Sequence, residues 1–337
     1  MSWTHNVSLK PYNTFGMDVL AAHWARVSSV DELPGLMAQV PDPSRVLILG
    51  GGSNVLLTGD VDRYVLHNEI PDIELIREEG DFVYVKSGAG VVWHDLVMHS
   101  IDRGWAGIEN LSLIPGSVGA APMQNIGAYG VELKEVFHEL EAWHLTNGSL
   151  DTFSHADCEF GYRESVFKRR LKGKYFITSV TLKLSKTPRF QVSYGAIEAQ
   201  LKEMGVGSLS IEAVSRAVIA IRQSKLPDPR VIGNAGSFFK NPVLDKAHFE
   251  ELQAQYPTIP GYPVDAGHIK TAAGWLIEQA GWKGYSEGDF GVHDRQALVL
   301  VNRGHARGRD IYDLSSRIIS DINRRFGIEL EREVNII

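Results

Sequence analysis

A glycine-rich segment directly follows a short apolar run near residue 50. The run is Val46-Leu47-Ile48-Leu49, and the segment after it reads Gly50-Gly51-Gly52-Ser53-Asn54. This order predicts a buried strand that ends in a tight turn, whose backbone N–H groups can hold a pyrophosphate. The Rossmann fingerprint is absent, because Val55 stands three residues after Gly52 and no helix pattern follows. The lysine of a P-loop is absent as well. A plain structural turn remains the alternative.

A second glycine-rich turn lies within residues 107–130. This stretch has no helical or strand period, and long segments of that kind inside a domain are usually ordered loops with a function. Its Gly116-Ser117-Val118-Gly119 sequence offers another set of backbone donors. Two such turns without a standard nucleotide fingerprint favour a flavin or another diphosphate ligand in a non-Rossmann fold. Two purely structural turns remain the alternative.

Strands dominate the pattern up to about residue 185, and helices dominate after it. The runs predict strands over residues 46–49, 64–67, 73–77, 82–85, 140–145, 150–153, 175–184, 297–302 and 328–334. Apolar residues at helical spacing predict helices over residues 30–39, 92–103, 211–222, 246–255, 272–280 and 310–326. This is the pattern of an α+β fold, not the strict alternation of a doubly wound sheet.

The segment Gly233–Pro242 combines glycines with aromatic residues and reads Gly-Asn-Ala-Gly-Ser-Phe-Phe-Lys-Asn-Pro. Its glycines, asparagines and proline make it a poor helix and a poor strand. The two adjacent phenylalanines indicate that it packs against the protein, and Gly236 leaves the Ser237 hydroxyl approachable. A buried functional loop and a tight structural turn both fit this composition. No Gly-x-Ser-x-Gly pattern is present, so Ser237 is not an obvious acyl nucleophile.

Two cations are candidates for binding an anionic ligand. The plain interpretation of Arg163 is a surface arginine paired with Glu164 or Glu159. The functional interpretation is a partly buried cation that polarises a carboxylate. Lys225 supplies a positive charge upstream of Ser237.

Length and composition limit the class of protein. A chain of 337 residues predicts two or three domains. The net charge of −7 argues against a nucleic-acid partner and against an anionic membrane surface. The single cysteine, Cys158, excludes an intramolecular disulfide and a multi-cysteine zinc site, and the histidines show no metal spacing, so we expect no metal. No signal-peptide pattern and no run of about 20 apolar residues is present, so we expect a cytoplasmic protein.

A set of separated motifs runs in a fixed order along nearly the whole chain. They are Asn13–Gly16, Gly50–Asn54, Ile114–Pro122, Gln124–Gly130, Tyr162–Ser165, Gly236–Pro242, Ala273–Ile277 and Glu333–Val334. One such motif could arise by chance, whereas the ordered set is highly specific. On these residues the chain resembles the UDP-N-acetylenolpyruvoylglucosamine reductases, flavoenzymes that complete UDP-N-acetylmuramate in bacterial peptidoglycan synthesis. Tyr194, in Ser193-Tyr194-Gly195, resembles the longer class of this family, in which such a tyrosine closes over the substrate.

The resemblance implies a fold in three parts. Residues 1–70 with 328–337, and residues 71–225, are expected to form two lobes of an FAD-binding module of the vanillyl-alcohol oxidase and p-cresol methylhydroxylase type. Residues 226–327 are expected to form a C-terminal α+β substrate domain. We expect a monomer.

The resemblance also implies a mechanism. In the family, NADPH reduces FAD and leaves, and hydride then passes from the flavin to the enolpyruvyl ether of UDP-N-acetylglucosamine. Arg163 and Glu333 match the residues that stabilise the enolic intermediate, and Ser237 matches the proton donor. A developing enolate needs a fixed cation, and preorganised charge in a dry site is usually the largest catalytic contribution. Glu333 is expected to act in a protonated or hydrogen-bond-relaying form, because a carboxylate would repel the intermediate.

The matching positions predict two further sets of contacts. The cofactor set is Gly50, Gly51, Gly52, Ser53, Asn54, Pro115, Gly116, Ser117, Gly119, Ala120, Asn125, Gly127 and Arg222. The substrate set is Tyr194, Lys225, Asn241, Tyr262 and Gln296.

One position departs from the family pattern, because many relatives carry a proline where this chain has Arg332.

Two other functions remain open at this point. One is an FAD-dependent oxidoreductase of the same superfamily that acts on a different substrate. The other is a catalytically silent flavin or nucleotide-binding protein, against which the retention of Arg163, Ser237 and Glu333 argues.

Overall fold

The computed structural model describes residues 2–194 and 196–337. Backbone packing divides the chain into two compact units. Unit 1 comprises Met1–Val7, Ala21–Gly52 and Asp62–Ser224, and unit 2 comprises Ser8–Leu20, Ser53–Val61 and Lys225–Ile337. Met1 and Gly195 lie outside the described residues. Within those residues, no helix is both long and apolar enough to span a membrane.

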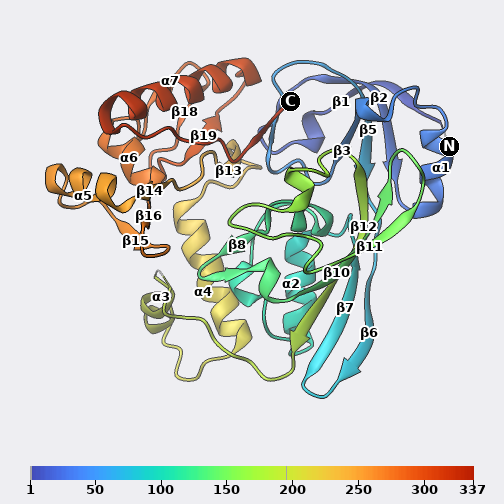
Figure 1. The fold of residues 1–337 in the computed structure, drawn as a ribbon, viewed down its shortest axis with the longest axis horizontal. Coiled ribbons are helices and arrows are strands. Elements are labelled where there is room, and N and C mark those ends of the chain that lie inside the picture. Colours follow the sequence, from blue (N-terminus) through green and yellow to red (C-terminus); the bar gives the residue numbers. More distant parts are fainter. Residues whose placement is uncertain (1, 195) are drawn as a thin grey trace. The chain divides into compact units, whose positions relative to one another are not determined.

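The first sheet of unit 1 carries the predicted strand at 46–49. Its order is β1-β2-β5-β3, with β1 Thr4–Ser8, β2 Leu20–Val27, β5 Val61–Asn68 and β3 Val46–Leu49. The short helix α1 (Leu33–Met37) buries Leu33 and Leu36 in one apolar cluster with residues of these strands. β3 runs parallel to β5 and pairs Leu49 with His67, so the chain reaches Gly50 at the end of β3 (Figure 1).

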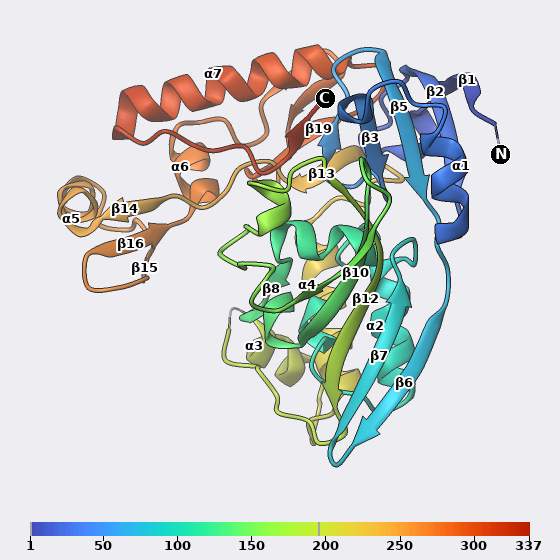
Figure 2. The same cartoon turned by 45° about the vertical axis from the view of Figure 1, so that its right-hand side comes forward.

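The second sheet of unit 1 is antiparallel throughout, in the order β11-β10-β12-β7-β6. Its strands are β6 Ile73–Glu79, β7 Phe82–Gly88, β10 Phe137–His144, β11 Leu150–Ser154 and β12 Tyr175–Ser185. Helices α2 (Trp93–Asp102) and α4 (Ile211–Lys225) lie on one side of this sheet (Figures 1 and 2), and α3 (Ile197–Glu203) packs on α4. Trp93 and Leu96 of α2 are buried with Val180 of β12, and each such side chain contributes roughly 1.5–3 kcal/mol.

Unit 2 contains the long helix α7 (Gly308–Phe326). Its buried stripe includes Ile311, Leu314, Ile318 and Ile322 at spacings of three and four, and Gly327 ends the helix with φ 66°. A four-stranded sheet has the order β13-β19-β18-β17, and a three-stranded sheet has the order β14-β16-β15. The remaining elements are β13 Gly233–Ser237, β14 Val243–Asp245, α5 Lys246–Gln255, β15 Gly261–Pro263, β16 His268–Thr271, α6 Ala273–Gln279, β17 Ser286–Glu287, β18 Phe290–Val292 and β19 Val299–Asn302. A further parallel pair joins β4 (Val55–Leu56) to β20 (Asn335–Ile336).

Most predicted elements are confirmed. The α+β content is as expected, and strands β6, β7, β10 and β11 and helices α1, α2, α4, α5, α6 and α7 lie where the apolar patterns predict them. The Ser210 hydroxyl accepts a hydrogen bond from the Ala213 N–H at 3.0 Å at the start of α4.

Two local predictions are wrong. Residues 233–237 form strand β13, although their composition predicts neither helix nor strand, because they pair with β19 through a register shift between Asn234 and Ser237. Residues 328–334 do not form a continuous strand. They make one isolated bridge between Arg332 and Phe239, and the regular pairing comes later, in β20.

Cys158 is fully buried, and burial raises the pKa of its thiol to about 12, because the surroundings disfavour the thiolate. Since the thiolate is the reactive form, the native protein should react with Ellman's reagent at pH 8 about 10³-fold more slowly than an exposed thiol. The same chain unfolded in guanidinium chloride should react fully. Rapid labelling of the native protein would contradict this environment.

His268 at the start of β16 faces two carboxylates: its Nδ1 lies 2.8 Å from Asp265 and its Nε2 lies 3.6 Å from Asp245. The hydrogen bond to Asp265 is the main reason that the pKa of His268 is raised. The ion pairs therefore stabilise this turn fully below the ordinary histidine value of about 6.5 and lose their effect as pH rises through the raised pKa. An NMR titration should show this raised value, and it should fall in Asp265→Asn and stay unchanged in Asp313→Asn. An unshifted His268 would refute the pairing.

Candidate active site

The two glycine-rich turns of unit 1 meet where β3 ends. A Cβ atom on Gly51 would lie 3.1 Å from the Gly116 Cα, and a Cβ on Gly50 would collide with the Ser117 Oγ. Gly52 has φ 58°, a left-handed conformation that favours glycine. The structure thus brings the two predicted turns into direct contact, with the Gly51 backbone against that of Gly116 and the Ser117 side chain against Gly50.

The second turn is held by the connection that follows β7. Val118 N–H donates to the Val91 carbonyl at 2.8 Å, and Gly119 N–H donates to the Ala89 carbonyl at 2.8 Å. A Cβ on Gly119 would lie 2.5 Å from the Ala89 Cβ, so only glycine permits this approach. Pro115 and Ala120 lie at the two ends of the same turn.

Arg163, Asn125 and Gly127 are also brought together in unit 1. The Arg163 Nη2 donates to the Gly127 carbonyl at 2.6 Å, and its guanidinium lies 5.2 Å from the centre of the Tyr162 ring. Asn125 is buried, and its amide donates to the Gly161 carbonyl at 3.0 Å. Arg163 has φ 54° and Asn125 has φ 42°, which are strained values for these residue types.

Glu159, one of the two partners expected for Arg163 alongside Glu164, makes ion pairs with two other arginines. The Glu159 carboxylate pairs with Arg170 at 2.8 Å and with Arg169 at 3.4 Å. Arg163 itself contacts the Gly127 carbonyl and the Tyr162 ring, and these contacts hold its guanidinium in place.

The side chain of Arg222, on α4, contains a buried hydrogen-bond donor. Its Nε is buried and has no hydrogen-bond partner among residues 2–194 and 196–337. Burial lowers the pKa of Arg222. Burial is also the main effect on two neighbouring groups, because it raises the pKa of Tyr129 and lowers that of His94. The Arg222 charge has a smaller effect, which lowers the pKa of both groups. Buried polar groups without partners are rare in native proteins, so this atom indicates a ligand acceptor.

Ser237 stands at the end of β13 in unit 2. Ser237 pairs with Val299, and Gly236 before it has φ 68°. Phe238 and Phe239 are buried, with their rings 5.3 Å apart and Phe238 6.3 Å from Phe15. The predicted packing of this segment is confirmed.

Glu333 lies in the same part of unit 2, because the residue before it, Arg332, forms a β-bridge with Phe239. Glu333 N–H donates to the Phe238 carbonyl at 2.9 Å, and Lys240 N–H donates to the Glu331 carbonyl at 2.9 Å. The Lys240 ammonium also lies 2.6 Å from the Glu331 carboxylate. The backbone of Glu333 is therefore bonded to the residue next to Ser237.

Asn54 lies on the other side of Glu333. Its amide donates to the Glu333 carbonyl at 3.3 Å, and its own carbonyl accepts from the Asn335 side chain at 3.0 Å. Ser53 and Asn54 belong to unit 2, whereas Gly50–Gly52 belong to unit 1.

The predicted substrate residues have mixed environments. The Asn241 side chain accepts from the Ala273 N–H at 3.0 Å at the start of α6, so it has a structural role there. Tyr262 on β15 and Tyr194 are exposed, and a Cβ on Gly130 would lie 3.1 Å from the Tyr194 Cβ. Gln296 packs near Gly274, and Lys225 ends α4. Gly195 of the tyrosine motif lies outside the described residues.

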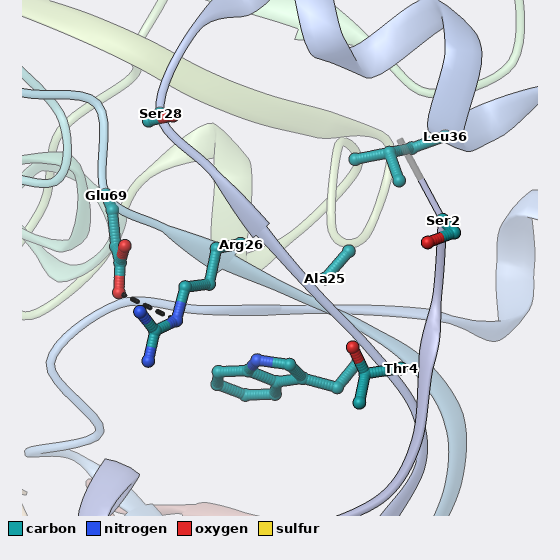
Figure 3. Close-up of a pocket in the computed structure, with 8 residues that line it drawn as sticks. Ser2, Thr4, Ala25, Arg26, Ser28, Leu36 and Glu69 are labelled. Atoms are coloured by element: carbon teal, nitrogen blue, oxygen red, sulfur yellow. Dashed lines mark ion pairs between the residues drawn. The ribbon is translucent and has the colours of Figure 1, made fainter.

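A surface cavity of about 360 Å³ lies elsewhere in unit 1, beside β2. Figure 3 shows Arg26 directed at Glu69, with their charged groups 3.6 Å apart. None of the residues that line this cavity is a predicted site residue; they are Ser2, Thr4, Trp24, Ala25, Arg26, Ser28, Leu36 and Glu69. Among the described residues, no group of three or more His, Cys, Asp or Glu side chains could hold a metal ion.

Sequence reasoning missed Tyr129 and His94 beside Arg222, and Lys240 near Glu333. Tyr129 and Lys240 lie inside motifs named above, but those motifs assigned them no role. Arg332 was identified only as a departure from the family pattern, and its contacts with α7 could not be predicted. His94 carries no local pattern.

The chain is similar to known protein families along most of its length. Residues 21–154 match the FAD binding domain family, and residues 228–337 match the family described as UDP-N-acetylenolpyruvoylglucosamine reductase, C-terminal domain. The chain is 48% identical over 333 residues to the UDP-N-acetylenolpyruvoylglucosamine reductase of Flavobacterium johnsoniae, with 98% of each chain covered. It is 50% identical over 334 residues to that of Chromobacterium violaceum, again with 98% of each chain covered.

A solved structure has the same fold. The crystal structure of UDP-N-acetylenolpyruvylglucosamine reductase from Thermus caldophilus matches with a TM-score of 0.68 at 24% identity, covering 98% of this chain and 97% of that one. The expected α+β fold, an FAD-binding module with a C-terminal domain, is confirmed. The chain belongs to the UDP-N-acetylenolpyruvoylglucosamine reductase family.

Proposed function

We propose that this protein reduces the enolpyruvyl ether of UDP-N-acetylglucosamine to UDP-N-acetylmuramate in peptidoglycan synthesis, with FAD as cofactor and NADPH as reductant. The observation that carries the proposal is the near-full-length identity of 48–50% to relatives named for this reduction. Within that function, the predicted residues, domain limits and location are our own assignments.

The residues of unit 1 fit FAD. The backbone N–H groups of Gly50–Gly52, Gly116 and Ser117 would hold the diphosphate, and the buried Arg222 Nε would donate to the flavin. Asn125 and Gly127 would line the same region, and Ser53 and Asn54 extend the first turn. When bound, FAD supplies a carrier that accepts a hydride from NADPH and donates one to the enolpyruvyl double bond.

Arg163, Ser237 and Glu333 are the proposed catalytic residues. Arg163 is held by the Gly127 carbonyl and the Tyr162 ring, so its charge needs no rearrangement to stabilise an enolate. The Ser237 Oγ would deliver a proton to the carbon beside the substrate carboxylate. Glu333 would hold or relay a proton as a neutral carboxyl group, since an ionised one would oppose the developing negative charge.

The substrate contacts are proposed from the same pattern. Tyr194, Lys225, Asn241, Tyr262 and Gln296 would bind the sugar nucleotide, and Tyr194 is exposed enough to close over it. The division into lobes 1–70 with 328–337 and 71–225, and a substrate domain 226–327, stays a prediction, as do a cytoplasmic location and a monomeric state.

The purified protein tests the function directly. It should be yellow, bleach when NADPH is added without oxygen, and regain its colour when the enolpyruvyl sugar nucleotide follows. Absorbance at the flavin maximum measures both steps. Colourless protein that cannot take up FAD would refute the proposal. Yellow protein that bleaches but ignores the sugar nucleotide would favour another FAD-dependent oxidoreductase of the superfamily.

Arg222→Met should have opposite effects on the apoprotein and on cofactor binding. Removing a buried donor that has no partner among the described residues should raise the melting temperature of the apoprotein. Losing a charge-assisted hydrogen bond of about 1.5–3 kcal/mol should weaken FAD binding about 10–100-fold. Fluorescence titration of the apoprotein with FAD measures the second effect, and Arg216→Met, an exposed arginine on the same helix, is the control. Unchanged FAD affinity would rule out this contact.

A further inference from the structure

The Arg332 side chain is held by helix α7 of unit 2. Its Nε donates to the Ser315 hydroxyl at 2.8 Å, and its Nη2 donates to the Ser316 hydroxyl at 2.7 Å. Its guanidinium carbon lies 4.6 Å from the centre of the Tyr312 ring. A planar guanidinium that meets two acceptors and an aromatic face at once has little rotational freedom.

The two serines are arranged to accept. The Ser315 hydroxyl donates to the Tyr312 carbonyl at 2.6 Å, and the Ser316 hydroxyl donates to the same carbonyl at 3.1 Å. Because each proton is directed along the helix, the oxygen lone pairs remain for Arg332. α7 itself is fixed by its buried stripe, so this set of contacts, which we call the α7 clamp, is a rigid anchor.

The backbone on either side of Arg332 is bonded to the segment that carries Ser237. Glu333 N–H donates to the Phe238 carbonyl, and Lys240 N–H donates to the Glu331 carbonyl, both at 2.9 Å. In extended backbone, successive side chains point to opposite faces. Holding Arg332 on α7 therefore turns its neighbour Glu333 away from the helix.

This bridge does not use the Arg332 N–H, since the donors are Glu333 and Lys240. A proline, which lacks that N–H and fixes φ through its ring, is compatible with the same pairing. The α7 clamp and a proline ring are thus two ways to restrain the same backbone.

We propose that Arg332 is a positioning residue that orients Glu333 through the α7 clamp. The inference rests on the proposed function, in which Glu333 is catalytic. It predicts that losing the clamp slows the step at the sugar nucleotide and leaves the NADPH step intact.

The test uses the FAD-loaded enzyme and stopped-flow absorbance of the two half-reactions. Arg332→Ala should slow flavin reoxidation by the enolpyruvyl sugar nucleotide about 10–100-fold, because small misplacements of a catalytic group have effects of that size. Flavin reduction by NADPH should stay within about twofold of wild type. The Ser315→Ala/Ser316→Ala variant should slow reoxidation in the same way, and Arg332→Pro should recover most of the rate.

Two controls separate positioning from general damage. Arg309→Ala should change neither half-reaction, although Arg309 lies 5.1 Å from the same Tyr312 ring and pairs with Asp313. Arg332→Ala in a Glu333→Gln background should add little further loss, because both changes act through one carboxyl group.

The outcomes distinguish the two proposals. If wild-type reduced enzyme is not reoxidised by the sugar nucleotide, the proposed function fails and this inference fails with it. If wild type is reoxidised and Arg332→Ala matches it, only the positioning role is overturned. Equal losses in both half-reactions, or full additivity with Glu333→Gln, would also overturn it, since they indicate a structural effect alone.

Discussion

The close approach of two backbones, at Gly50–Gly51 and at Gly116–Ser117, is the constraint on which unit 1 depends. A Cβ on Gly51 would press against the Gly116 backbone, and a Cβ on Gly50 would collide with the Ser117 hydroxyl. β3 therefore has to end at Leu49. The turn at 115–120 has to be fixed to the connection after β7, which the hydrogen bonds of Val118 and Gly119 achieve. The result is a surface of backbone N–H groups whose positions are set by the sheets, with little freedom left to the loops themselves. Such preorganisation reduces the entropy lost when an anion binds.

Several residues near this surface have strained backbone conformations. Asn125, Tyr129 and Arg163 all have positive φ, and left-handed conformations of such residues cost about 1–3 kcal/mol each. Their hydrogen bonds and the buried cluster around α2 offset that cost. The buried Arg222 Nε, which has no hydrogen-bond partner within the described part of the chain, adds a further unfavourable contribution. Unit 1 therefore holds several groups in positions that the apoprotein alone does not favour, which is typical of sites prepared for a ligand.

Local signals in the sequence predicted much of this fold. Helix α7 follows from apolar residues at helical spacing, and strands such as β3 and β12 follow from their apolar runs. β13 could not be predicted, because its pairing with β19 joins Asn234 to Val301 across the chain. The absence of a continuous strand over residues 328–334 could not be predicted either, because it also depends on pairing with residues far away in the sequence. At the site, motif order indicated the glycine turns, Arg163, Ser237 and Glu333. It could not indicate the missing acceptor at Arg222 or the contacts of Arg332, because these depend on which side chains the fold brings together.

The pairing of β4 with β20 has a consequence for how the chain folds during synthesis. The Thr58 hydroxyl donates to the Ile337 carbonyl across a sequence separation of 279 residues. At about 5–20 residues per second, the ribosome needs roughly 14–56 s to cover that distance. β4 emerges early and has to wait for its partner strand, while most of unit 1 has already emerged. The segment that carries Glu333 is thus made long after β4, so a chain released by the ribosome before residue 333 would lack this part of the site however well unit 1 had folded.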